Sequence, residues 1–412
     1  MKKIMTGNGG KKLDKYDIVI IGAGIIGLSI AFELKKRDSS LALAILEKES
    51  QVAQHSSGRN SGVLHAGFYY TADSLKARFT RDGNTEMTNY CLDRGIKINR
   101  CGKLVVATSV EEIQGLEELK RRADRNGVNL LWVDEREAAQ IEPNIRTVEK
   151  ALYSPTTSSV DPMEVCQKLK ETLIQMRVDI FFNTPYTGYK NGLVMAGELK
   201  IKADYIINAA GLYADKIAHD FNFGKKYTII PFKGVYLKYT KNKTDIRTNI
   251  YPVPNLANPF LGVHFTKTVD GNIKIGPTAI PAFWRENYLG MQNFNIGEFL
   301  LVAGYEMKLF ITNSFNFRSL ASNEMKKYNR RHFIQLAEKM VRHLDKDGFG
   351  DYLRPGIRAQ LLNKESLELV QDFIIEGDNR TLHILNAVSP AFTCAFPFAR
   401  FVIDKMIELK RN

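Results

Sequence analysis

The pattern of hydrophobic and polar positions begins with an unbroken apolar run over residues 16–21, typical of a strand buried on both faces. Three glycines follow in the spacing Gly22-x-Gly24-x-x-Gly27, and a pattern typical of a helix comes next. A second apolar run over residues 41–46 ends on an acidic side chain. This order of strand, glycine turn, helix, strand and acid predicts a βαβ unit that binds a dinucleotide.

Each glycine of this unit has a physical role. Gly22 allows the tight turn, Gly24 lets a pyrophosphate approach the backbone, and Gly27 lets the helix pack against the strand. The helix N-terminus offers free N–H groups and a positive dipole end to the phosphates, beginning at Ile25 and Ile26.

The acid at the end of the second run, Glu47, is placed to accept hydrogen bonds from an adenosine ribose. The alternative is a glycine-rich turn in an ordinary βαβ unit, which the complete order of elements makes the weaker interpretation. The motif leaves open whether the dinucleotide is NAD or FAD.

Further helices and strands are predicted along the rest of the chain. Helices are expected from the N-cap Ser74 towards Gly95, over 111–126, from Asp161-Pro162 to about Met176, over much of 295–343, and over 395–410. Strands are expected over 103–108, 178–183 and 199–208, within 229–275 as an antiparallel sheet, and within 353–386, whereas 51–70 is expected to be a loop. Nucleotide-type elements therefore occur in three separate stretches, which predicts a discontinuous nucleotide domain.

Composition and cysteine spacing restrict the class of protein. The chain has 412 residues with 44% hydrophobic and 25% charged residues, as in ordinary soluble globular proteins. Its four cysteines, Cys91, Cys101, Cys166 and Cys394, form no CxxC pair, which favours a reducing compartment and argues against structural zinc. No metal site is predicted.

The net charge of +13 bears on which kinds of partner the protein could bind. Residues 1–15 hold five lysines and one aspartate, and we expect this Gly-rich tail to be disordered. The remaining positive charge is spread thinly and accompanies no nucleic-acid motif, so it favours an acidic substrate and no nucleic-acid partner. The tail lacks a secretory h-region, and the apolar stretch 18–32 is too short to span a bilayer. We expect a cytoplasmic protein, with peripheral attachment to the inner face of the membrane left open.

Five further segments carry a family resemblance: HSSGRNSGVLHAGFYYTADSLKA (55–77), CGKLVVATS (101–109), LGVHFTKTVDGNIKIGPTA (261–279), PGIRAQL (355–361) and LHILNAVSPAFT (382–393). With the N-terminal motif, the chain resembles the L-2-hydroxyglutarate dehydrogenases and oxidases from about residue 15 to about residue 408. These enzymes belong to the FAD-dependent, D-amino-acid-oxidase-like superfamily, so the resemblance implies non-covalent FAD rather than NAD.

The resemblance also implies an α/β fold of two parts. A discontinuous Rossmann-like FAD-binding domain is expected at 16–80, 150–220 and 350–412, after the tail of residues 1–15. An α+β substrate domain, built on an antiparallel sheet that roofs the flavin, is expected at 81–149 and 221–349.

Family position and residue type together indicate the FAD contacts. Lys48 is expected to flank the adenosine, and backbone atoms of Val178 to meet the adenine. The isoalloxazine is expected along Ser57, Asn60, Ser61 and Gly62. Further contacts are expected from Ala209, Ala210 and Gly211, and from Pro390 to Thr393, which lead into the last helix.

For the reaction, the resemblance implies oxidation of L-2-hydroxyglutarate to 2-oxoglutarate by hydride transfer from C2 to flavin N5, with reoxidation by a quinone, another acceptor or oxygen. His264 is favoured slightly as the base for the hydroxyl proton and His65 is expected close to the flavin, although a lone histidine is more often structural. Candidates for binding the dicarboxylate are Arg358 as a bidentate clamp, Lys233 and Arg354 for the distal carboxylate, and Tyr70 as a wall.

The segment PFKGVYLKY (231–239) departs from the family pattern PFRGEYY. Lys233 replaces an arginine, Val235 a glutamate and Leu237 a tyrosine. The alternative is therefore an FAD enzyme of the same superfamily that acts on an amino acid, another 2-hydroxy acid or glycerol 3-phosphate. A flavoprotein that binds nucleic acid or modifies tRNA, and a non-catalytic member of the fold that serves as a binding module, are weaker alternatives.

Overall fold

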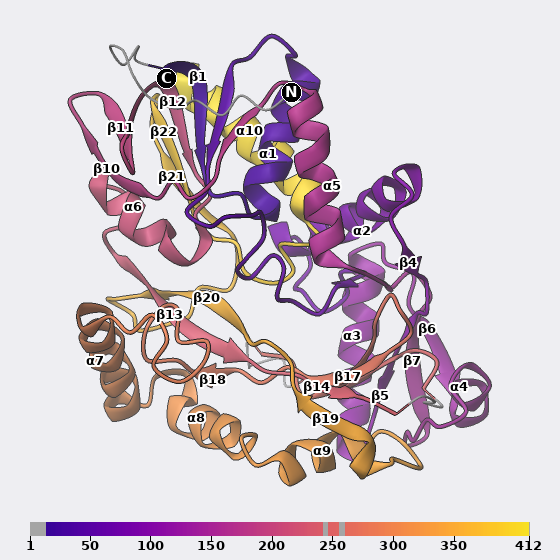
Figure 1. Cartoon of the computed structure of the whole chain (residues 1–412). Helices are drawn as coiled ribbons and strands as arrows, with labels where there is room; N and C mark the ends of the chain where they lie inside the picture. The colour runs from indigo at the N-terminus through magenta and orange to yellow at the C-terminus, as the bar shows by residue number, and fades with distance from the viewer. Residues whose placement is uncertain (1–13, 242–245, 255–259, 412) are drawn as a thin grey trace.

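The predicted βαβ unit lies in an eight-stranded mixed sheet of the computed structural model, which describes residues 14–241, 246–254 and 260–411 (Figure 1). The parallel part of this sheet comprises β1 (Asp14–Ile21), β2 (Leu43–Leu46), β9 (Asp179–Phe181), β12 (Leu199–Asn208) and β22 (Thr381–Asn386). Antiparallel strands extend it: β10 (Tyr186–Lys190), β11 (Leu193–Ala196) and β21 (Ile374–Gly377).

Both faces of this sheet are covered, which explains its continuous apolar runs. On β1, Ile18 and Ile20 face one core, whereas Val19 and Ile21 face the other. The first core is covered by α1 (Ile25–Arg37), α2 (Leu75–Asp93), α5 (Pro162–Gln175) and α10 (Ala395–Arg411), and the second receives α6 (Ala214–Asp220).

Two helices begin at the predicted caps. The side chain of Ser74 accepts a hydrogen bond from the N–H of Ala77, and that of Asp161 accepts one from Met163. The predicted tail, by contrast, is too long by two residues, because Asp14 and Lys15 pair with β12. Its residues 1–13 lie outside the described residues.

The other large sheet is shown in the lower part of Figure 1. Its order is β19 (Phe349–Tyr352), β14 (Leu237–Tyr239), β17 (Ile273–Gly276), β16 (His264–Lys267), β15 (Asn249–Pro252), β5 (Lys103–Val106), β7 (Lys150–Ser154) and β6 (Leu131–Asp134). The predicted antiparallel arrangement holds for every pair except β15 with β5, which is parallel. This join unites two stretches far apart in sequence, so no local turn imposes an antiparallel pairing.

Two smaller sheets and the remaining helices complete the described fold. The sheet of β13 (Tyr227–Gly234), β18 (Ile280–Pro281) and β20 (Gly356–Asn363) lies between the two large sheets (Figure 1). The other joins β3 (Val63–Leu64), β4 (Ile98–Asn99) and β8 (Ser158–Val160), so the predicted loop 51–70 contains a short strand. The helices are α3 (Ile113–Arg125), α4 (Glu135–Ile141), α7 (Ile296–Thr312), α8 (Phe317–Lys326) and α9 (Arg330–Glu338).

Within the described chain, no helix has the length and apolar character to cross a bilayer. The predicted domain boundaries stay a prediction.

Candidate active site

A cavity of about 690 Å³ lies between the carboxyl ends of the parallel strands and the strands β13, β16 and β20. In open α/β sheets, ligands bind at the carboxyl ends of the strands. The cavity is therefore where the dinucleotide motif predicts a ligand. Its wall includes Gly22, Glu47 and Ala209 on the sheet side, and Tyr236, His264 and Arg358 on the opposite side.

The glycine turn has the close contacts that the motif requires. Gly22 has a φ of +108°, and a Cβ there would lie 2.6 Å from the carbonyl oxygen of Ala209. A Cβ on Gly27 would lie 2.0 Å from the carbonyl oxygen of Gly22, so the helix approaches the strand as expected. Only glycine fits at either position without a shift of backbone.

The N-terminus of α1 suits an anion. Gly24 is the N-cap residue and supplies no side-chain cap, and no acidic residue lies in the first turn. The N–H of Ile25 donates to Oγ of Ser57 at 2.9 Å, so Ser57 lies against the helix start. Glu47 is 8% exposed, and its carboxylate accepts hydrogen bonds from the backbone N–H groups of Ala23 and Glu49. This cradle fits the pyrophosphate and ribose of a dinucleotide.

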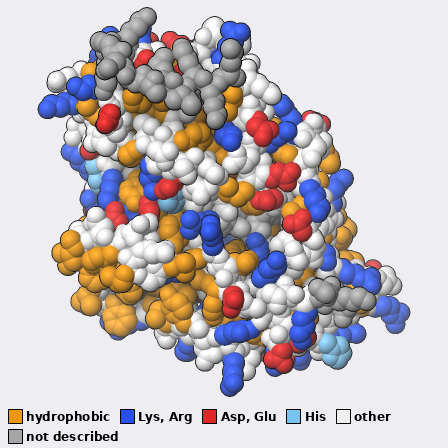
Figure 2. Space-filling view, viewed as in Figure 1, with side chains coloured by type: hydrophobic (Ala, Val, Ile, Leu, Met, Phe, Trp, Pro, Cys, Tyr) orange, Lys and Arg blue, Asp and Glu red, His pale blue; other side chains and the backbone are white. Residues whose placement is uncertain are grey.

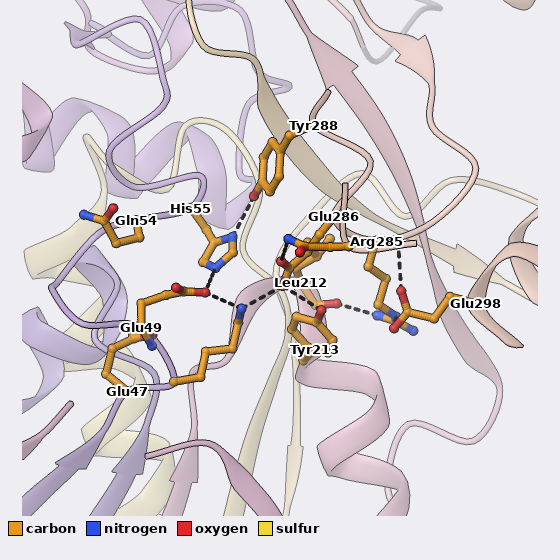
Figure 3. A network of polar contacts seen from close by, with 12 residues as sticks. Glu47, Glu49, Gln54, His55, Leu212, Tyr213, Arg285, Glu286, Tyr288 and Glu298 are labelled. Atoms are coloured by element: carbon orange, nitrogen blue, oxygen red, sulfur yellow. Dashed lines mark hydrogen bonds and ion pairs between the residues drawn. The ribbon is translucent and has the colours of Figure 1, made fainter. Parts of the chain in front are cut away.

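An ion-pair network adjoins the Glu47 end of the cavity (Figure 3). Nζ of Lys48 lies 2.5 Å from Glu49 and 2.7 Å from Glu286, which also accepts a hydrogen bond from Tyr213. His55 lies between Tyr288 and Glu49, at 2.6 and 2.9 Å.

The ligand atoms of Glu49, His55 and Glu286 are close enough to hold a metal ion. However, the ammonium of Lys48 already bonds both carboxylates, so we assign the group as an ion-pair network. This network connects Glu286, in the loop after β18, to Lys48 and Glu49, in the segment after β2.

Both predicted histidines line the same cavity, although 199 positions separate His65 from His264 in the chain. Nδ1 of His264 lies 2.8 Å from the carbonyl oxygen of Gly262, so this nitrogen carries the proton and Nε2 is the basic nitrogen. The His264 ring stacks on Tyr251 with centroids 3.7 Å apart. Burial lowers the pKa of His264 to about 3, which keeps the ring neutral.

The surroundings of His65 favour the opposite tautomer. Its Nδ1 lies 3.4 Å from Nζ of Lys103, a hydrogen-bond donor, so Nδ1 is the acceptor and Nε2 carries the proton. Burial, with the nearby charges of Lys103 and Arg358, holds the pKa of His65 well below its usual range. The two rings thus offer a base at Nε2 of His264 and a donor at Nε2 of His65.

Lys103, which the sequence did not indicate, does not line the cavity but contacts His65 from behind the lining. It is fully buried, with Nζ 4.2 Å from the ring centroid of Tyr251 and 5.1 Å from that of Tyr69. Burial lowers the pKa of Lys103 to about 7. Its position at the start of a predicted strand carried no signal, because a strand lysine ordinarily faces solvent.

Arg358 on β20 also lines the cavity and lies 5.0 Å from the ring centroid of Phe260. Burial lowers its pKa, and the nearby Tyr70 and Tyr236 counteract this effect. A guanidinium partly withdrawn from water is well suited to bind a carboxylate.

The structure brings most of the other predicted site residues to this cavity. Its lining includes Ile25, Ile26, Lys48, Ser57, Asn60, Ser61, Ala210, Gly211, Pro390 and Thr393. Thr393 is also tied to His65, since its Oγ1 accepts the backbone N–H of that histidine.

Five predicted residues do not line the cavity, besides Gly27 in the turn. Val178 is packed in the core beneath the helices, because the strand it precedes lies at the sheet edge. Gly62 lies outside the lining, and its N–H donates to Oδ1 of Asn60. Tyr70 lies near the charge of Arg358, Lys233 is half-buried on β13, and Arg354 is exposed. Their ligand contacts stay predictions.

Comparison with known proteins agrees with this geometry. The family model of FAD dependent oxidoreductases matches residues 17–404. The L-2-hydroxyglutarate dehydrogenase of Escherichia coli strain K12 is 34% identical over 96% of this chain and 94% of its own length. The mitochondrial L-2-hydroxyglutarate dehydrogenase of Homo sapiens is 33% identical over 98% of this chain and 91% of its own length.

The fold is also that of solved flavoenzymes. The L-alpha-glycerophosphate oxidase of Mycoplasma pneumoniae, solved with FAD bound, superimposes with a TM-score of 0.77 at 24% identity, covering 96% of this chain and 95% of that one. This likeness confirms the predicted FAD-binding fold. With an FAD-type cradle and relatives that match over nearly the whole chain, the protein belongs to the L-2-hydroxyglutarate dehydrogenase family of FAD-dependent oxidoreductases.

Proposed function

We propose that this protein oxidises L-2-hydroxyglutarate to 2-oxoglutarate and delivers the electrons to a quinone, another acceptor or oxygen. The observation that carries the proposal is that two neutral histidines and Arg358 line the same cavity as the dinucleotide cradle. Those groups meet the requirements for oxidising a hydroxyl carbon that bears a carboxylate.

His264 acts as the base. Its Nε2 accepts the proton of the 2-hydroxyl group, while the hydrogen bond that Nδ1–H donates to the Gly262 carbonyl holds the ring in the required tautomer. When bound, FAD supplies the acceptor for the hydride that leaves C2, so the alcohol carbon becomes a carbonyl. The N–H of His65 donates a hydrogen bond to the substrate oxygen.

Arg358 binds one carboxylate in a bidentate manner. Lys103 and Lys274 add positive charge around the histidines, and each of them lowers the pKa of His264. The arrangement favours a substrate with negative charge. We retain Lys233, Arg354 and Tyr70 as candidates for the distal carboxylate, with Lys233 ahead of the exposed Arg354.

The cofactor contacts follow the same geometry. Gly22, Gly24 and the N–H groups of α1 hold the pyrophosphate, Glu47 binds the ribose, and Lys48 flanks the adenosine. Ser57, Asn60, Ser61 and residues 390–393 border the isoalloxazine, and Gly62 is retained as a candidate beside them. A cytoplasmic location agrees with the four cysteines, all free and none paired among the described residues.

The test is an anaerobic absorbance titration of the purified yellow protein with each enantiomer of 2-hydroxyglutarate. We expect the flavin band to bleach with the L enantiomer and to persist with the D enantiomer. Bleaching by glycerol 3-phosphate or an amino acid alone would overturn the substrate assignment and leave the cofactor assignment standing. A protein that retains no FAD would overturn both.

A further inference from the structure

The segment 283–328, which contains α7 and α8, has an unusual distribution of side chains. Apolar residues that would ordinarily be buried face solvent, among them Met291, Leu300 and Ile311 at 67%, 64% and 66% exposed. Figure 2 shows hydrophobic side chains gathered at the lower left, where Figure 1 places α7. We define the apolar face as the exposed large side chains of this segment: Phe283, Leu289, Met291, Phe294, Ile296, Leu300, Leu301, Met307, Phe310, Ile311, Met325 and Tyr328.

The acidic residues of the same segment point inward. All four of its carboxylates are buried, namely those of Glu286, Glu298, Glu306 and Glu324. Three of them have internal partners: Glu286 bonds Lys48, Glu298 bonds Lys216, and Glu324 accepts the N–H of Ala279. The apolar face is therefore not a helix that has failed to pack, since its polar side is bonded to the rest of the protein.

The exposed charged side chains within the segment, and those that follow it at the start of α9, are all positive. Lys308, Arg318 and Lys326 are exposed within the segment, and Arg330 and Arg331 follow at the start of α9. A contiguous apolar patch of this kind marks an interaction site rather than ordinary surface. Its bordering charges select an anionic partner.

We propose that the apolar face docks the protein onto an anionic lipid bilayer, with α7 lying in the plane of the interface. Its apolar side chains enter the boundary of the acyl chains, and the surrounding lysines and arginines meet lipid phosphates. A second copy of the chain is a poorer occupant, because a symmetric contact would bring the same cations of both copies together. The proposal concerns a surface separate from the cavity and is independent of the substrate.

Vesicle flotation of the FAD-loaded protein tests this docking. We expect binding to vesicles of phosphatidylcholine mixed with phosphatidylglycerol, weaker binding to phosphatidylcholine alone, and a loss with rising salt. The variant Leu300→Gln/Leu301→Gln/Ile311→Gln should bind at least about tenfold more weakly. The variant Lys308→Glu/Lys326→Glu should also lose at least about tenfold, since each cation near an anionic surface contributes about a factor of five.

A matched control replaces exposed apolar side chains elsewhere. Leu131→Gln/Ile174→Gln changes residues that are 46% and 55% exposed outside the apolar face, and it should bind as the parent does. Thermal melting and FAD content of every variant establish that it is folded. Absence of binding by the folded parent to mixed vesicles would overturn the proposal, as would equal binding by the triple-glutamine variant. A concentration-dependent dimer that only that variant loses would assign the face to a second copy instead.

Discussion

Nζ of Lys103 lies 3.4 Å from Nδ1 of His65, within a wall of three aromatic rings. This contact makes Nδ1 the acceptor and leaves the proton of His65 on Nε2, whereas the Gly262 carbonyl leaves His264 with its lone pair on Nε2. Two histidines in one cavity thereby acquire different chemical roles. The distinction depends on the partner of each ring and not on the residue type.

Replacing the base should abolish most turnover. We expect His264→Ala to lower kcat at least about 100-fold, the usual contribution of a general base. His65→Ala should raise KM and lower kcat less, because it removes a donor and leaves the base. Steady-state kinetics and FAD content decide this, with exposed His343→Ala as the control. A His264→Ala enzyme with parental kcat would remove His264 from the role.

The low pKa of His264 has a consequence for the pH dependence of kcat/KM. Since burial lowers this pKa to about 3, the ring stays neutral and able to accept a proton until the pH approaches that value. The pH profile of kcat/KM should therefore show no loss from His264 protonation near neutral pH. A titration near pH 6 that disappears in His264→Ala would contradict the buried, neutral base.

Lys103 should make stability depend on pH. Its pKa falls from the ordinary value of 10.5 to about 7 on folding, so between these values the unfolded chain binds the extra proton. Stability should consequently rise as the pH increases from about 7 to about 10. The variant Lys103→Met should lose the part of this rise in the free energy of unfolding that Lys103 contributes, which is at most about 5 kcal/mol.

Chemical denaturation at several pH values measures this effect. Lys76 and Lys274, whose pKa values burial lowers to about 8, contribute a rise of the same sign in both proteins. The difference between parent and Lys103→Met is therefore the decisive quantity. Parallel curves would show that Lys103 keeps its ordinary pKa.

Arg358 should control affinity for the substrate carboxylate. We expect Arg358→Met to lower kcat/KM about 30-fold or more, mainly through KM, because truncating one partner of a buried charge pair costs about 2 kcal/mol or more. The kcat/KM of Arg358→Lys should lie between those of the parent and Arg358→Met, since lysine keeps the charge and loses the bidentate geometry. The exposed Arg380, which does not line the cavity, provides the matched control, and Arg380→Met should change kcat/KM by less than about threefold. Equal losses in both Met variants would contradict the assignment of Arg358.

Gly22 should be essential for FAD retention. A Cβ at this position meets the Ala209 carbonyl oxygen at 2.6 Å, so Gly22→Ala must move backbone at the pyrophosphate cradle. Gly192 also has a positive φ, +76°, but a Cβ there would meet nothing within 4 Å. Gly192→Ala should therefore cost about 1 kcal/mol and keep its FAD, whereas Gly22→Ala should be purified with little. The ratio of flavin to protein absorbance measures this, and full FAD in Gly22→Ala would refute the close-approach argument.

Local patterns were enough to predict the first βαβ unit and several helix ends. The glycines at 22, 24 and 27 act on their immediate neighbours, and the caps Ser74 and Asp161 bond N–H groups two or three residues away. Such interactions are encoded in short stretches, so the sequence carries them in full. Family resemblance extended this to the FAD-binding fold and the candidate site.

Only the tertiary structure decided which residues meet. His65, His264 and Arg358 line one cavity because three different sheets converge there, whereas Val178 lies outside its lining, next to the strand at the sheet edge beyond β2. The burial of Lys103 and the exposure of the apolar face break the usual rule that charges lie outside and apolar groups inside. Sequence by itself determined the local backbone, because neighbouring residues set those energies. The long-range packing determined protonation and exposure, because both depend on the water and charges that the folded chain removes or gathers around each group.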